Sequence, residues 1–317
     1  MEKRKLGQSS LELFPLALGT NVFGWTIDEP SSFELLDAFT GEGFSFIDTA
    51  DVYSRWGEGN KGGESETIIG NWLRKSGKRN EVIIATKVGS DMGQGKIDLT
   101  KDYIIRAAED SLRRLQTDTI DLYQTHFDDN TTPVEETLAA YDQLIREGKV
   151  RYIGASNLKP DRLKDSLKAA KEKGLPRYES FQPEYNLYNR DSFEGDLQQL
   201  CIRENLGVIT YFSLAAGFLT GKYRGEADLN KSKRGHGMDK YFTPRGFRIL
   251  DALDQVAARY SVTPASIALA WLIAQPGVTA PISSATSLQQ LNTLTEAARL
   301  QLDEESLQQL TEAGASQ

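Results

Sequence analysis

Four titratable side chains of different types stand at or just beyond the ends of apolar segments in this 317-residue chain. Residues 44–53, FSFIDTADVY, run through an apolar stretch to an aspartate, and a tyrosine follows five residues later. Residues 81–87, EVIIATK, end on a lysine, and residues 120–126, IDLYQTH, end on a histidine. A carboxylate, a phenol, an ammonium and an imidazole can all carry or exchange protons. Packing alone would place charge outside a sheet rather than repeatedly at one end of it, so the candidate functional residues are Asp48, Tyr53, Lys87 and His126.

The elements that position these side chains follow a regular alternation of short apolar strands and amphipathic helices. Repeated βα units of this kind predict a parallel sheet with helices outside it, and about eight strands are enough to close a TIM-type (β/α)8 barrel. The predicted barrel strands are residues 16–19, 44–49, 82–86, 120–125, 151–155, 179–182, 208–212 and 278–283.

Three features complete the predicted architecture. Residues 3–6 and 11–14 alternate around a GQSS turn, which predicts a short N-terminal β-hairpin. Residues 132–135, TPVE, predict a capping box with proline at the first helical position. The Gly- and Lys-rich residues 213–243 form a long loop after strand seven, and a loop of that length is usually functional. No Ser/Pro-rich linker divides the chain, so residues 1–317 are predicted to be one domain.

Composition narrows the classes of function. A net charge of −8 and a pI near 5.1 argue against standing attraction to nucleic acid or anionic membranes, although one small anion could still bind a local patch. Two histidines and a single cysteine leave too few ligands for the usual zinc site and exclude an intrachain disulfide. The N-terminus lacks an apolar signal region, and no apolar run approaches a membrane span. A cytoplasmic protein is expected.

Eight motifs follow one another along the chain: RKLGQSSLELFPLALGT, IDTADVY, TKVG, YQTH, IGASN, QPEYN, YFSLAAGFLTGK and PISSATSLQQL. In this order they resemble the aldo-keto reductase family from Arg4 to about Gly314. The resemblance implies a (β/α)8 barrel that transfers hydride between a nicotinamide cofactor and a carbonyl or alcohol without a metal.

By this resemblance the four candidates are a catalytic tetrad. A carbonyl that receives hydride at carbon needs a proton donor at oxygen, and Tyr53 is that general acid in the hypothesis. The ammonium of Lys87 is expected to stabilise the phenolate and lower the tyrosine pKa, with Asp48 orienting the lysine. An N–H of His126 would polarise the substrate oxygen. Alone, Asp48 could be a loop cap, Tyr53 a half-buried aromatic and His126 a structural histidine. Lys87 at the end of an apolar strand is the hardest to explain structurally, and the set of four favours catalysis.

The resemblance also implies cofactor contacts. The nicotinamide would be held by a carboxamide-binding group and a stacking ring, and the pyrophosphate by the long loop with backbone N–H groups and one lysine. An ordinary turn or flexible loop is the alternative for each of these segments. The residues are Ser156, Asn157, Gln182 and Tyr211 at the nicotinamide, and Ser213, Leu214, Gly217, Leu219 and Lys222 at the pyrophosphate.

The segment expected to bind the adenosine 2′-phosphate departs from the common pattern. Many family members carry a lysine or arginine here, whereas this chain has only hydroxyls and amides and so lacks charge-assisted bonds. NADPH is the expected cofactor, with NADH as the alternative. The expected contacts are Ser283, Ser284, Thr286, Gln289 and Gln290.

The substrate side is predicted to include Trp25, Trp56 and Phe127. Residues 57–62, GEGNKG, fit a dinucleotide fingerprint, but they lie too far from the strand end and are interpreted as a substrate-side loop. Two other functions stay open: a Schiff-base lyase that uses Lys87, and a cofactor-binding regulatory subunit, because the family includes potassium-channel β subunits. The identity of the small carbonyl substrate and the oligomeric state cannot be read from the sequence.

Overall fold

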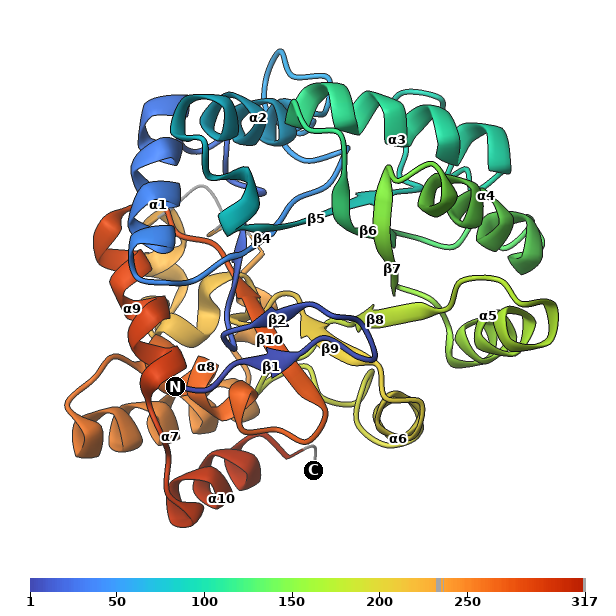
Figure 1. Cartoon of the computed structure of the whole chain (residues 1–317). Coiled ribbons are helices and arrows are strands. Elements are labelled where there is room, and N and C mark those ends of the chain that lie inside the picture. Colours follow the sequence, from blue (N-terminus) through green and yellow to red (C-terminus); the bar gives the residue numbers. More distant parts are fainter. Residues whose placement is uncertain (232–234, 236, 316–317) are drawn as a thin grey trace.

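The computed structural model describes residues 1–231, 235 and 237–315. Within them, eight parallel strands form a closed barrel in the order β10-β3-β4-β5-β6-β7-β8-β9, and helices form a ring outside it (Figure 1). The predicted (β/α)8 fold is confirmed. The barrel strands are β3 (Ala17–Gly19), β4 (Phe46–Asp48), β5 (Ile83–Val88), β6 (Ile120–Thr125), β7 (Val150–Ser156), β8 (Tyr178–Gln182), β9 (Gly207–Thr210) and β10 (Val278–Ser283).

Ten α-helices occur in the described residues, and most of them return the chain from one barrel strand to the next. Their apolar stripes pack on the outside of the barrel in one large core cluster. Their bounds are α1 (Glu29–Gly41), α2 (Glu64–Ser76), α3 (Lys101–Leu115), α4 (Val134–Arg146), α5 (Pro160–Lys173), α6 (Asp196–Arg203), α7 (Pro244–Tyr260), α8 (Pro264–Ile273), α9 (Leu288–Arg299) and α10 (Glu304–Ala313).

The start of α4 differs from the predicted capping box. Pro133 occupies the N-cap itself, the helix begins one residue later, and no side chain caps it. The hydroxyl of Thr132 instead makes a charge-assisted bond, donating to Asp129 Oδ2 at 2.6 Å. Pro133 has a φ of −55° and a ψ of 138°, so it precedes the helix rather than forming its first residue.

The predicted hairpin closes the end of the barrel where the strands begin. Strands β1 (Arg4–Lys5) and β2 (Glu12–Leu13) pair antiparallel and cross the front of the barrel in Figure 1. Leu6, Leu11 and Leu13 are buried in one apolar cluster with interior side chains such as Phe46 and Leu122. This end of the barrel is therefore filled, which leaves the opposite end, where the strands finish, for a ligand.

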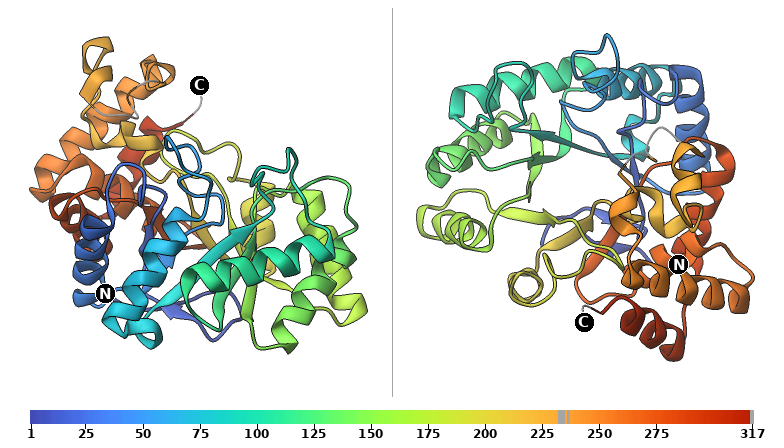
Figure 2. Two further views of the ribbon diagram at one scale, coloured as in Figure 1. Left: turned by 90° about the horizontal axis from the view of Figure 1, so that it is seen from above. Right: turned by 180° about the vertical axis from the view of Figure 1, so that it is seen from behind.

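The long loop after β9 contains three short 3₁₀ helices: η2 (Ala215–Thr220), η3 (Glu226–Lys231) and η4 (Asp239–Tyr241). Figure 2 shows this loop and the helices after it gathered on one side of the barrel. A further 3₁₀ turn, η1 (Lys78–Glu81), precedes β5.

No single helix in the described ranges is long and apolar enough to cross a membrane; α7 and α8 pass that test only as a pair bent by 94°.

Candidate active site

Three of the four candidate residues meet around one ammonium group. Asp48 ends β4, Tyr53 lies in the following loop, and Lys87 lies near the end of the neighbouring strand β5. Lys87 Nζ donates to Asp48 Oδ2 at 2.6 Å, to Tyr53 Oη at 2.9 Å and to the carbonyl of Thr49 at 2.9 Å. The in-register pairing of β4 with β5 brings the carboxylate and the lysine to the same rim. The sequence motif therefore becomes a continuous Asp–Lys–Tyr hydrogen-bond chain.

Lys87, the middle member of this hydrogen-bond chain, is a buried cation. Its side chain is 0% exposed and that of Asp48 is 1% exposed. Burial acts to lower the pKa of Lys87, but Asp48 and Tyr53 together outweigh burial, so the pKa is raised above its ordinary value. A fully buried ammonium with three oxygen acceptors is a poor amine nucleophile, because its lone pair is protonated. This geometry speaks against the Schiff-base alternative.

Tyr53 differs from the expectation in one respect. Burial raises the pKa of its phenol above the ordinary value, and the charge of Asp48 acts in the same direction, whereas Lys87 lowers it. The expected influence of Lys87 is present, but the expectation of a lowered pKa is wrong, because desolvation of the phenolate is the larger effect. Tyr53 is consequently protonated at neutral pH and keeps a proton to donate.

His126 follows β6 directly, and its ring centre lies 6.1 Å from that of Tyr53. Burial and the nearby Lys87 lower its pKa well below the ordinary range, so the imidazole is neutral. Ser90 Oγ lies 2.9 Å from Nδ1. If the serine donates this bond, the proton of the neutral ring is on Nε2. Sequence reasoning missed Ser90, whose one signal is its place three residues after Lys87.

Two side-chain amides donate to Asp48 Oδ1, the carboxylate oxygen to which Lys87 does not donate. Gln182 Nε2 donates to Asp48 Oδ1 at 3.0 Å, and Gln124 Nε2 donates to the same oxygen at 3.3 Å. Gln182 was expected to bind the nicotinamide, and in this structure its amide group contacts the carboxylate while its side chain lines the cavity. Sequence reasoning missed Gln124, although its position two residues before His126 places it on the same side of β6. Both amides help to orient the buried carboxylate of Asp48.

A cavity of about 1110 Å³ opens above this group. It brings together the tetrad members Asp48, Tyr53 and His126 with most of the predicted ligand contacts, while Lys87 lies behind them. The predicted residues that line it are Trp56, Phe127, Ser156, Asn157, Gln182, Tyr211, Ser213, Leu214, Gly217, Lys222, Ser283, Ser284, Thr286 and Gln290, together with Gln289.

One predicted cofactor contact and one predicted substrate contact lie elsewhere. Leu219 is buried in the core, and its N–H donates to the carbonyl of Leu214 at 3.2 Å, because residues 215–220 coil into η2 and turn that side chain inward. Trp25 does not line the cavity but stands behind Trp56, with ring centres 5.8 Å apart. Trp25 therefore supports a cavity wall rather than forming it.

The hydrogen-bonded side chains of Tyr211 and Asn157 form part of the cavity wall. Tyr211 Oη donates to Asn157 Oδ1 at 2.8 Å, and Asn157 Nδ2 donates to the carbonyl of His126 at 3.0 Å. Asn157 has a positive φ of 54°, a conformation that asparagine tolerates better than most residues. Ser156 Oγ donates to the carbonyl of Gln182 at 2.8 Å. These bonds fix the ring of Tyr211 at the cavity wall.

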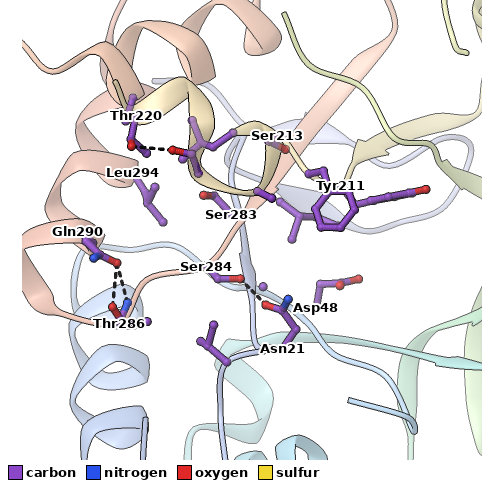
Figure 3. A pocket seen from close by; sticks show the side chains of 18 of the residues that line it. Asn21, Asp48, Tyr211, Ser213, Thr220, Ser283, Ser284, Thr286, Gln290 and Leu294 are labelled. Atoms are coloured by element: carbon purple, nitrogen blue, oxygen red, sulfur yellow. Dashed lines mark hydrogen bonds between the residues drawn. The ribbon is translucent and has the colours of Figure 1, made fainter. Parts of the chain in front are cut away.

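The other end of the cavity is lined by hydroxyls and amides (Figure 3). Ser284 Oγ donates to Asn21 Oδ1 at 2.7 Å, and Gln290 Oε1 accepts from both the N–H and the hydroxyl of Thr286. A side chain at Gly19 would meet Ser284 Oγ at 2.9 Å, so glycine keeps this wall open. Sequence reasoning missed Gly19, the last residue of β3, and Asn21, which lies two residues after it.

The size and lining of the cavity fit a dinucleotide. The hydroxyls and amides at one end of the cavity match the sugar–phosphate part of such a molecule. The ring of Tyr211 matches the nicotinamide part. Gly217 has a φ of 105°, and a Cβ at this position would lie 3.7 Å from Lys222 Nζ. The glycine therefore keeps the space beside this lysine open for an anion. In the part of the chain that the structure describes, no group of three or more His, Cys, Asp or Glu side chains could hold a metal ion.

The glycine-rich residues 57–62 form a loop and not a phosphate cradle. The N–H groups of Lys61 and Gly62 donate to the carboxylate of Glu64, the first residue of α2. These backbone donors already bind an anion of the chain itself, so the fingerprint match is coincidental. The neighbouring Trp56 reaches the cavity, as the substrate-side interpretation predicted.

Comparison with known proteins identifies the class that this fold and site define. The sequence profile of the Aldo/keto reductase family matches residues 15–315, and the chain belongs to this family. It is 35% identical over 320 residues to the uncharacterized oxidoreductase YrpG of Bacillus subtilis, covering 98% of this chain and 95% of the relative. It is 32% identical to the aldo-keto reductase YhdN of the same species, over 93% of this chain and 88% of the relative. It is also 32% identical to a probable voltage-gated potassium channel subunit beta of Oryza sativa, over 92% and 89%. The family and these relatives support an NAD(P)H-dependent oxidoreductase.

Proposed function

We propose that the chain reduces the carbonyl of an aldehyde, ketone or sugar to an alcohol, reversibly, with Tyr53 as the general acid. The observation that carries this proposal is the Asp48–Lys87–Tyr53 hydrogen-bond chain at the cavity floor beside a neutral His126. A nicotinamide cofactor, when bound, supplies the hydride.

The chain's own residues then handle the proton and the charge on oxygen. Tyr53, which carries its proton at neutral pH, donates it to the carbonyl oxygen as that oxygen becomes negative. The ammonium of Lys87, 2.9 Å from Tyr53 Oη, stabilises the phenolate that remains. The neutral His126 directs an N–H to the same oxygen and orients the carbonyl without competing as an acid.

NADPH is the proposed cofactor, with NADH as the alternative. Among the described residues, the segment from Ser283 to Gln290 contributes no positive side chain to the cavity lining, and the Thr286 donors already bond to Gln290. Lys222 lines the same cavity, and its ammonium can contact a phosphate of the cofactor. The proposal also places the reaction in the cytoplasm, with a small carbonyl compound as the partner and with neither nucleic acid nor membrane.

A regulatory subunit is the second candidate, favoured by the named potassium-channel β relatives. The two candidates separate in one experiment on the purified full-length chain. Dissociation constants for NADPH and NADH are measured by fluorescence titration, and initial rates are measured with a panel of aldehydes, ketones and sugars, for wild type and Tyr53→Phe.

The enzyme proposal expects turnover that falls about 10²–10⁴-fold in Tyr53→Phe, while the cofactor dissociation constant stays within threefold. Turnover that survives this substitution would refute the role of Tyr53. Tight cofactor binding without turnover of any carbonyl would favour the regulatory subunit.

A further inference from the structure

The cavity beside the tetrad has walls made of aromatic rings. From His126 the rings continue on one side to Phe127, stacked with centres 4.6 Å apart at 19°. From Tyr53 they continue on the other side to Trp56, with centres 6.0 Å apart. The two proton-handling residues therefore stand at the inner ends of two aromatic walls.

These walls leave apolar surface open to solvent. Trp56 is 48% exposed and Phe127 is 38% exposed although both line the cavity. Phe212, at 48% exposed, lines the same cavity beside Tyr211, with ring centres 5.3 Å apart. Of the substantially exposed Trp and Phe side chains in the described residues, only Phe247 lies outside the cavity. Burying an aromatic ring contributes roughly 1.5–3 kcal/mol, so this concentration of exposed rings is unfavourable for folding and indicates a binding surface.

The backbone of Phe212 is strained, and hydrogen bonds to its carbonyl hold it in that conformation. Its φ of 50° lies in the left-handed region, which a bulky side chain rarely adopts. Its carbonyl accepts bonds from the buried Asn186 Nδ2 at 2.9 Å and from the N–H of Ala215 at 2.7 Å. Strained residues fixed in this way gather at functional sites.

The described cations that line the cavity come from another segment of the chain. Among the described lining residues, the only ammonium groups belong to Lys222 and Lys231, which come from the long loop after β9. Arg55, which precedes Trp56, bonds to Asp91 instead. The aromatic walls thus offer no described cation to a carboxylate or phosphate.

We propose that the preferred substrate is a neutral, planar aromatic aldehyde or ketone, bound between Trp56 and Phe127 with Phe212 at the cavity mouth. This inference rests on the proposed function. Trp56 contacts the ring of Tyr53, and Phe127 stacks on the ring of His126. A carbonyl whose oxygen reaches Tyr53 and His126 would therefore have its substituent beside Trp56 and Phe127. Offset and edge-to-face ring contacts stabilise an aromatic substituent beyond its apolar area, which makes planarity the discriminating property.

The test compares matched pairs of aldehydes. Benzaldehyde and cyclohexanecarbaldehyde have the same carbon skeleton size and differ in planarity and π electrons. Conjugation makes the benzaldehyde carbonyl intrinsically less reactive, so a preference for it must come from the protein. Two ring contacts predict kcat/KM about 10-fold or more higher for benzaldehyde. Methyl 4-formylbenzoate should likewise exceed 4-carboxybenzaldehyde by about 10-fold or more, because the carboxylate would lose its hydration without gaining a partner.

Variants and an inhibitor pair locate the effect. Trp56→Leu, Phe127→Leu and Phe212→Leu keep apolar surface but remove the ring, and each should lower the benzaldehyde-to-cyclohexanecarbaldehyde ratio about threefold or more. Phe247→Leu removes an exposed ring outside the cavity and should leave the ratio unchanged. Competitive inhibition by benzamide should be stronger than by cyclohexanecarboxamide, which tests binding without turnover.

The outcomes separate this inference from the proposed function. Turnover of aldehydes with equal ratios for the matched pairs, or with a preference for the carboxylate or for sugars, would overturn the aromatic substrate and leave the reductase in place. Failure to reduce any carbonyl would overturn the proposed function itself, whereas benzamide would then still report on the aromatic walls.

Discussion

Replacement of Lys87 by methionine tests the centre of the proposed mechanism. At 2.9 Å and an effective dielectric constant of about 20, the ammonium stabilises a Tyr53 phenolate by about 6 kcal/mol. If about half of that charge has developed in the transition state, about 3 kcal/mol is lost, which is about a 10²-fold slower hydride-transfer step. Single-turnover oxidation of bound NADPH, followed by absorbance, measures this step directly.

The same substitution also affects stability, and a second variant separates the two effects. Without Lys87, the carboxylate of Asp48 stays buried with only amide and phenol partners, which should lower the free energy of unfolding by about 3–5 kcal/mol. Adding Asp48→Asn removes the uncompensated charge and should restore much of the stability without restoring the rate. Denaturant unfolding measures the first quantity and single turnover the second.

A matched control uses a buried ion pair away from the cavity. Arg114 Nε contacts Glu66 Oε2 at 2.6 Å, and Glu66 is fully buried. Arg114→Met should destabilise the fold comparably and leave hydride transfer unchanged. The tuning role of Lys87 would be refuted by an unchanged single-turnover rate in Lys87→Met, or by recovery of that rate in the double variant.

Three further predictions concern positioning, pH and packing. Ser90→Ala should lower kcat about tenfold with little change in cofactor affinity, because His126 loses its hydrogen-bond partner at Nδ1. An unaltered kcat and pH profile would contradict this positioning role of Ser90. Asp51 is buried without a side-chain hydrogen bond among the described residues, and burial raises its pKa from 3.8 to about 8. Between pH 3.8 and about 8 the folded state therefore keeps the Asp51 proton that the unfolded state releases. As the pH rises through this range, the free energy of unfolding of the wild type should fall by up to about 1.4 kcal/mol per pH unit relative to Asp51→Asn. Parallel stability–pH curves for the two proteins would contradict the raised pKa of Asp51. Gly70→Ala should destabilise strongly, since its new methyl would lie 2.1 Å from a backbone oxygen of α3, whereas Gly41→Ala meets nothing within 4 Å and should be neutral in thermal unfolding.

Much of the active site could be predicted from the sequence because each residue type stands at a recognisable place. Strand ends are local features, visible as apolar runs that stop at Asp48, Lys87 or His126. The alternation of strands and helices then predicts the barrel, and the barrel places all its strand ends on one face. The family motifs contributed the ligand assignments, most of which the cavity lining brings together.

Other properties depend on contacts between segments that are distant in the chain. The raised pKa of Tyr53 results from burial and the charge of Asp48, which together outweigh the ammonium of Lys87, and no sequence pattern shows which influence is larger. Leu219 belongs to the core because η2 turns it inward, against its expected place at the cofactor. Ser90 and Gln124 act through bonds to His126 and Asp48 that only the closed barrel forms.

By itself the sequence determined the order of strands and helices, the residue types at the strand ends and the small number of thiol and imidazole groups, since these are properties of composition and local periodicity. The tertiary structure decided which charges are desolvated, which donors are already bonded and which rings remain exposed around the cavity. Desolvation and exposure depend on every neighbour at once. The strained Phe212 illustrates the difference, because an aromatic residue in a loop becomes a candidate for specificity only when its backbone angle and open cavity face are known.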